Sequence, residues 1–76
     1  MSINEYKDML NVKGISFQVI GDYSIRIPYI KITVEVHETL SEKLLVQIYD
    51  NNNDKKIASN TYKTFNGVKN FIKKHL

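Results

Sequence analysis

The spacing of apolar residues changes along the chain, and the first spacing is helical. Apolar side chains recur every three to four residues at Ile3, Tyr6, Met9 and Leu10. Ser2 followed by Glu5 forms the capping-box pattern, in which each residue satisfies a free backbone N–H of the other. Gly14 is a natural stop at the other end. The pattern predicts an amphipathic helix over residues 3–12.

Strict alternation of apolar and polar residues follows. The apolar members are Ile15, Phe17 and Val19, and then Tyr23, Ile25 and Ile27. Gly21 and Asp22 lie between the two runs and favour a tight turn, so these residues predict a β-hairpin. Tyr6 and Tyr23 share the phase of the core residues, and we expect both rings to complete the hydrophobic core.

The apolar phase changes from odd to even positions near Pro28. The even positions are Ile30, Ile32, Val34 and Val36. A shift of one residue would send every later side chain to the opposite face of a strand. Proline lacks an N–H and is tolerated at a bulge, a bend or a strand end. We therefore expect a strand or strand pair broken near Pro28, with its second segment at about residues 29–37.

The rest of the chain predicts two more strands and a second helix. A loop at 37–42 precedes a strand at 43–49, an Asn/Asp turn at 50–54 and a weaker strand at 56–62. Thr64 can cap a final helix. The apolar stripe of that helix is Phe65, Val68, Phe71, Ile72 and Leu76. The expected fold class is α+β: one domain over residues 1–76, with one small antiparallel sheet of about four to five strands and an N-terminal and a C-terminal helix packed on it.

Positive charge is concentrated near the C-terminus. The 76 residues carry a formal charge of +3, but residues 1–54 sum to −3 and residues 55–76 to +6. The cations are ten lysines and one arginine, Arg26, although arginine is the usual choice for gripping phosphate. The asymmetry predicts either a contact surface for an acidic partner or a solvated helix face.

Residues that could carry chemistry are sparse. There is no cysteine, and the two histidines, His37 and His75, lie far apart without companion ligands. The Asn/Asp run 50–54 lacks the glycine and terminal glutamate of a calcium loop. Isolated glycines exclude a phosphate-binding loop, and no serine sits in a nucleophile elbow. We therefore expect no metal, no cofactor and no enzymatic activity.

Binding is the function class that remains. Tyrosine is enriched at protein interfaces, and Tyr49 shares its strand face with Leu45, opposite the core phase. The lysines of the basic C-terminal third are the other candidates. The predicted partner-binding residues are Leu45, Tyr49, Lys55, Lys56, Lys63, Lys69 and Lys73.

A family resemblance bears on the nucleic-acid alternative. From Ile30 onward the chain has two strands, an Asn/Asp-rich turn, a lysine-bearing strand and a helix, with Asn53-Asp54-Lys55-Lys56 and Tyr62-Lys63-Thr64 before that helix. In layout, residues 30–76 resemble the arm-type DNA-binding domain of tyrosine integrases, whose three-stranded sheet lies in the major groove. The resemblance implies DNA contacts from Lys31, Gln47, Tyr49, Lys55 and Lys56. The family's sheet is typically arginine-rich, whereas Lys31, Thr33, Glu35 and His37 are mixed in charge.

The sequence thus favours a small non-catalytic binding protein that docks on a larger protein as an inhibitor or regulator. Its Lys-, Asn- and Ile-rich composition suggests an accessory protein of a phage or mobile element. The alternative is a nucleic-acid-binding domain that uses the basic C-terminal third. A homodimer closing over residues 43–49 is compatible with either. The polar N-terminus and the absence of a long apolar run lead us to expect a cytoplasmic protein without membrane contact.

Overall fold

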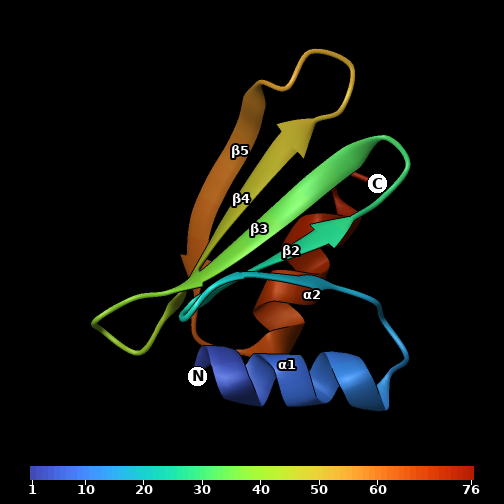
Figure 1. Cartoon of the computed structure of the whole chain (residues 1–76). Helices are drawn as coiled ribbons and strands as arrows, with labels where there is room; N and C mark the ends of the chain where they lie inside the picture. Colours follow the sequence, from blue (N-terminus) through green and yellow to red (C-terminus); the bar gives the residue numbers. More distant parts are fainter.

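The computed structural model describes all 76 residues and contains one five-stranded antiparallel sheet with two helices (Figure 1). The elements are α1 (Ile3–Val12), β1 (Gln18–Gly21), β2 (Ser24–Pro28), β3 (Ile32–Glu38), β4 (Leu44–Asp50), β5 (Lys56–Tyr62) and α2 (Phe65–Lys73). The strands lie in the sheet in chain order, so each pairs with the next along the sequence. The predicted α+β class, with one antiparallel sheet and a helix from each end of the chain, is confirmed. Neither helix combines the length and the apolar character that crossing a membrane requires.

Helix α1 begins and ends as the sequence predicts. The N–H of Glu5 donates to Oγ of Ser2 at 3.1 Å, and the N–H of Ser2 donates to Oε1 of Glu5 at 3.2 Å. The hydrogen bond from the Ser2 N–H, together with the Ser2 side chain, holds the pKa of the Glu5 carboxyl below its ordinary value. At the other end Gly14 has a φ of 70°, which a residue without Cβ adopts at little cost. The N–H of Ile15 donates to the carbonyl of Leu10 at 3.0 Å, as in a Schellman motif.

The first hairpin differs from its prediction in two places, the start of β1 and the turn between β1 and β2. Strand β1 begins at Gln18 rather than at Ile15, because Ile15 is engaged by the end of α1 and only then does the chain turn toward the sheet. Tyr23 is 64% exposed, so its predicted burial is wrong. Gly21 pairs with Ser24, which leaves Tyr23 in the turn itself, where the alternation of the strands no longer applies.

The change of phase at Pro28 is explained by a second hairpin. Strand β2 ends at Pro28, and β3 begins only at Ile32. The N–H of Tyr29 closes the turn by donating to the carbonyl of Ile32 at 2.9 Å. Odd positions of β2 pair with even positions of β3, as Ile25 does with Val36, so both sets face one side of the sheet. The predicted strand pair broken near Pro28 is confirmed, although residues 29–31 form the turn.

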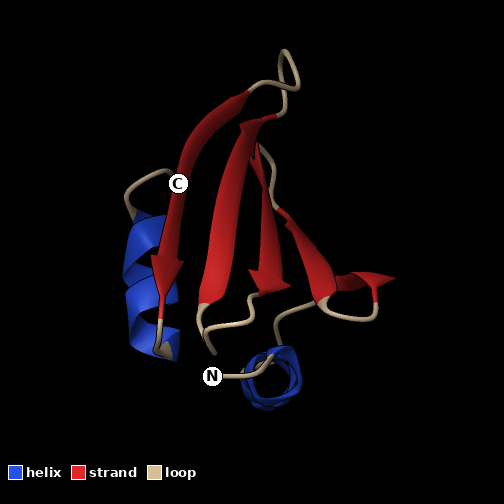
Figure 2. Ribbon diagram, turned by 90° about the vertical axis from the view of Figure 1, so that its left-hand side faces the viewer, coloured by secondary structure: helices blue, strands red, loops and turns tan.

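The core lies between the helices and one face of the sheet. All 14 buried residues are hydrophobic. The sheet supplies Ile25, Ile27, Ile32, Val34, Val36, Leu44, Val46 and Ile48, and the helices supply Ile3, Tyr6, Leu10, Phe65, Val68 and Ile72. Helix α1 contacts β3, and α2 contacts β4 and β5 (Figure 2). The opposite face of the sheet carries no helix and is called the open face below.

Candidate functional site

An apolar pocket of about 180 Å³ lies between α1 and α2. Seven of its ten lining residues are hydrophobic, and the other three are lysines. The hydrophobic lining consists of Tyr6, Leu10, Ile15, Tyr29, Phe65, Ile72 and Leu76. The lining is therefore mostly apolar, and every charged residue in it is positive.

Local structure explains why these residues meet. The rings of Tyr6 on α1 and Phe65 at the start of α2 pack with their centroids 5.3 Å apart and form the floor where the helices join. The Schellman end of α1 directs Ile15 toward the core, and the β2–β3 turn brings in Tyr29. Leu76, predicted as part of the stripe of the last helix, lies beyond α2 and is 64% exposed beside the pocket.

Three lysines surround this apolar lining. Lys13 caps the C-terminus of α1, and its Nζ lies 5.4 Å from the centroid of the Phe65 ring, within the range of a cation–π contact. Lys69 and Lys73 are one turn apart on α2 and therefore share a face of that helix. The two ion pairs of the chain both use Glu35, and neither includes a lysine. The three ammonium groups are thus available to an external anion.

The two tyrosines of the pocket are uncharged at neutral pH. Burial raises the pKa of the Tyr6 hydroxyl well above its ordinary value, and the neighbouring Tyr29 raises it further. Burial also raises the pKa of Tyr29. Because both hydroxyls keep their protons, neither tyrosine adds a negative charge beside the lysines, and each hydroxyl remains a potential hydrogen-bond donor.

The open face of the sheet carries a chain of polar contacts between β2 and β3. Oγ of Ser24 lies 2.6 Å from Nδ1 of His37, and Nε2 of His37 lies 3.3 Å from Oε1 of Glu35. Nη2 of Arg26 donates to the other oxygen of Glu35 at 3.1 Å. Serine, histidine and carboxylate are the components of a nucleophilic triad. However, neither Ser24 nor His37 lines the pocket between α1 and α2, or the hollow on the open face that Arg26 and Glu35 share with Tyr49.

The structure contains no cluster of metal-ligating side chains. No three His, Asp or Glu side chains gather closely enough to hold an ion. The Asn/Asp segment forms a turn, as predicted, and its side chains bond to its own backbone. The carboxylate of Asp50 accepts from the N–H of Asn52 at 2.8 Å, and the side-chain oxygen of Asn53 accepts from the N–H of Lys55 at 3.0 Å. These bonds are typical of Asx turns, so the segment serves to connect β4 and β5.

Comparison with protein-family models, with curated proteins and with solved structures gave no match.

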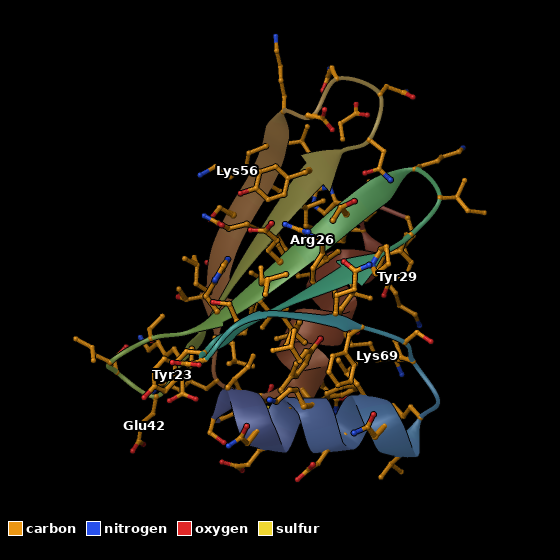
Figure 3. The ribbon with its side chains drawn as sticks, in the orientation of Figure 1. Tyr23, Arg26, Tyr29, Glu42, Lys56 and Lys69 are labelled. Carbon is orange, nitrogen blue, oxygen red and sulfur yellow. The ribbon has the colours of Figure 1, made fainter.

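The residues predicted to bind a partner do not form one surface, as the separation of Lys56 from Lys69 shows (Figure 3). Leu45 and Tyr49 of β4 are in the phase of the open face, and Tyr49 pairs with Lys56 of β5. Lys55 immediately precedes Lys56 in the β4–β5 turn. Leu45 and Tyr49 are both half-buried there rather than freely exposed. On the opposite side of the sheet, Lys69 and Lys73 border the pocket. Lys63 is exposed in the short connection between β5 and α2.

Sequence reasoning missed Lys13 and the two tyrosines that complete the pocket. Lys13 directly precedes the helix-ending Gly14, so its place at the end of α1 could have been found from the sequence. Its nearness to Lys69 and Lys73 could not, because it depends on how α1 and α2 cross on the sheet. The pocket is a product of tertiary packing rather than of a local motif.

Proposed function

We propose that this chain is a non-catalytic binding protein that docks on an acidic segment of a larger protein through the pocket between α1 and α2, and thereby inhibits or redirects that protein. The observation that carries this proposal is an apolar hollow whose only charged lining residues are three lysines free of ion pairs. Protein interfaces combine an apolar centre with a charged rim, and the pocket has both. The composition rich in lysine, asparagine and isoleucine supports an accessory protein of phage or mobile-element type.

The distribution of lysines favours a protein partner over a nucleic acid. A phosphate backbone is bound best by one continuous basic surface. Here Lys69 and Lys73 lie on the helix-covered side of the sheet, whereas Lys56 follows the phase of the open face. The lysines of residues 55–76 are therefore divided between two sides of the molecule and do not form one continuous basic surface.

One observation nevertheless supports nucleic-acid binding as a second candidate. The contacts implied by the integrase resemblance lie together: Gln47, Tyr49 and Lys56 are on the open face, Lys55 is in the adjoining turn, and the carbonyl of Lys31 accepts from Asn51 at the same end of the sheet. Carboxylates interrupt this surface, because Glu35 and Asp54 line a hollow there together with Tyr49. We therefore rank this candidate second.

A selection experiment separates the two candidates. A random library of sixteen-residue peptides is displayed and selected on the immobilised protein, and the selected peptides are mapped by amide chemical shifts in ¹⁵N-labelled protein. We expect acidic peptides that shift amides of α1 and α2. Labelled duplex DNA and single-stranded RNA are titrated in parallel at low and physiological salt. Saturable, steeply salt-dependent nucleic-acid binding, together with no enriched peptide, would reject the proposed function in favour of the second candidate.

A further inference from the structure

The size of the pocket limits what can enter it. An apolar cavity of about 150 Å³ holds a single benzene ring, whereas pockets for drug-sized ligands start at about 300 Å³. At about 180 Å³, this pocket has room for one six-membered ring or one branched aliphatic side chain. A nucleotide or an extended lipid chain would not be enclosed. The occupant is therefore the size of a single amino-acid side chain.

The walls favour an aromatic occupant. Three aromatic rings line the pocket, from Tyr6, Tyr29 and Phe65, and two of them already pack against each other at a centroid distance of 5.3 Å. Aromatic rings gain free energy from edge-to-face contacts beyond the burial of area alone. The neutral hydroxyls of the two tyrosines add no charge that an apolar ring would have to desolvate.

The charges stand beside the pocket on two different elements. Lys13 belongs to the end of α1, and Lys69 and Lys73 belong to α2. The Nζ of Lys13 reaches the ring of Phe65, one turn before Lys69 on α2, so carboxylates beside an inserted ring would meet lysines that come from both helices. By contrast, an anion at the tip of the ring would enter first and be carried among apolar walls, where an unpaired charge is costly.

We infer that the pocket binds one aromatic side chain of a partner protein that has carboxylate residues beside it in sequence, and that these carboxylates pair with Lys13, Lys69 and Lys73. This inference rests on the proposed function, because it specifies the segment through which the larger protein is bound. The bound segment carries carboxylates as its anions. A tyrosine phosphate is excluded as the inserted side chain because its charge is at the tip of the ring.

The test uses blocked synthetic peptides and isothermal titration calorimetry. The parent probe has a central phenylalanine, two acidic residues on each side and a glycine at each end. Three relatives replace the phenylalanine by alanine, the four acids by their amides, or the phenylalanine by phosphotyrosine. We expect the parent to bind most tightly. The alanine peptide should be weaker by about tenfold or more, since a buried aromatic side chain contributes at least that factor.

Matched protein variants locate the interaction. One variant combines Lys13→Gln, Lys69→Gln and Lys73→Gln. The other combines Lys31→Gln, Lys55→Gln and Lys56→Gln, which removes the same charge at residues that do not line the pocket. All six side chains are exposed, so both variants should fold, which circular dichroism checks. The first variant should weaken the parent peptide by about tenfold in total, from modest contributions of each contact, and the second by less than about twofold. Raising the salt concentration should weaken the wild type and leave the first variant nearly unchanged.

The outcomes distinguish the inference from the function on which it rests. Equal affinity for the phenylalanine and alanine peptides, still lost in the pocket variant, would overturn the aromatic anchor and leave acidic docking intact. Tighter binding of the phosphotyrosine peptide would likewise overturn the inference. Failure of every acidic peptide to bind, or equal losses in both lysine variants, would count against the docking function as well. Shifts confined to amides of α1, α2 and the residues around Tyr29, with the expected order of affinities, support both.

Discussion

The backbone N–H of Ile3, in the first turn of α1, donates a 2.7 Å hydrogen bond to Oε1 of Glu38 at the end of β3. A carboxylate at a helix N-terminus satisfies an unpaired donor and opposes the positive end of the helix dipole. The N-terminal ammonium of Met1 adds a second tie, a 2.7 Å hydrogen bond to the carbonyl of Glu42. The start of α1 is thus fixed to the β3–β4 loop, which orients the helix that forms one wall of the pocket.

Removing the Glu38 carboxylate should loosen α1. We expect Glu38→Ala to lower the free energy of unfolding by about 1–2 kcal/mol, because a partly buried backbone N–H loses a charged acceptor. Glu38→Gln keeps an acceptor without the charge and should lose less. Urea unfolding followed by circular dichroism measures the series. Glu42→Gln serves as a control because Glu42 contacts Met1 only through its backbone carbonyl. Equal stability of all variants would show that the hydrogen bond does not fix α1.

Gly67 in the first turn of α2 should not tolerate alanine, although alanine favours a helix by about 1 kcal/mol. A Cβ at Gly67 would lie 2.9 Å from Cδ1 and 3.3 Å from Cβ of Tyr62, whose ring packs 5.3 Å from that of Phe71. We expect Gly67→Ala to destabilise the fold by about 1 kcal/mol in thermal or urea unfolding, because crowding outweighs the gain in propensity.

A double-mutant cycle separates crowding at Gly67 from other causes. Tyr62→Ala removes the 2.9 Å contact with the ring but keeps the Cβ of residue 62, so in that background Gly67→Ala should cost clearly less than in the wild type. Asn66→Ala, at an exposed neighbouring position of the same helix, measures the effect of propensity alone. If Gly67→Ala costs the same in both backgrounds, the contact with Tyr62 is not the reason for the glycine.

Glu42 is a position where glycine should be better than the residue present. Its φ is 59°, in the left-handed region, where a Cβ is unfavourable. We expect Glu42→Gly to raise the unfolding free energy by roughly 0.5–1 kcal/mol, since relief of backbone strain exceeds the added entropy of the unfolded chain. Ser41→Gly, one residue earlier and without a positive φ, should lower stability slightly. The same sign for both substitutions in urea unfolding would contradict the explanation.

Alkaline pH should destabilise the protein through Tyr6. Burial raises the pKa of Tyr6 in the folded state above the ordinary tyrosine value of 10.0, so the unfolded chain releases this proton first. The contribution of Tyr6 is fully present below about pH 10 and is lost as the pH rises toward the folded-state pKa. Tyr6→Phe should therefore show a shallower loss of unfolding free energy between pH 9 and pH 11.

The control for this titration is Tyr23→Phe, because Tyr23 is 64% exposed in the β1–β2 turn. It should follow the wild-type pH dependence. All other ionisable groups are common to the proteins compared and cancel in the comparison. A Tyr6→Phe profile parallel to the wild type would show that the Tyr6 hydroxyl is not desolvated in the folded state.

Local signals account for most of the elements that the sequence predicted correctly. Ser2, Glu5 and Thr64 define helix starts by bonds within one turn. Strand β4 follows its alternation, and the strong turn signal after it marks where β5 begins. Pro28 marked a boundary because proline restricts the backbone wherever it occurs. The errors at Ile15 and Tyr23 have a common cause. Alternation of apolar and polar residues predicts a strand, but it does not show where the strand begins or ends. Ile15 belongs to the end of α1 and Tyr23 to the hairpin turn, so neither lies in a strand.

The candidate site was less accessible to prediction for the same physical reason. The lysines of residues 55–76 stood out by their number, yet the structure assigns Lys69 and Lys73 to one side of the sheet and Lys56 to the other. Which of them act together depends on the crossing of α1 and α2, and no pattern within either helix encodes that angle. Lys13, in the acidic part of the sequence, joined them only in three dimensions.

The order of the strands has a consequence for how the chain folds. Because every strand pairs with its neighbour in sequence, the whole sheet can form from local hairpins, each with a small entropic cost of loop closure. The contact between Tyr6 and Phe65 joins helices from opposite ends of the sequence and closes the largest loop of all. We therefore expect substitutions at Phe65 to accelerate unfolding in stopped-flow measurements while barely slowing refolding, and substitutions at Val34 or Val46 to slow refolding. The pocket would then be the last part of the molecule to form and the first to open.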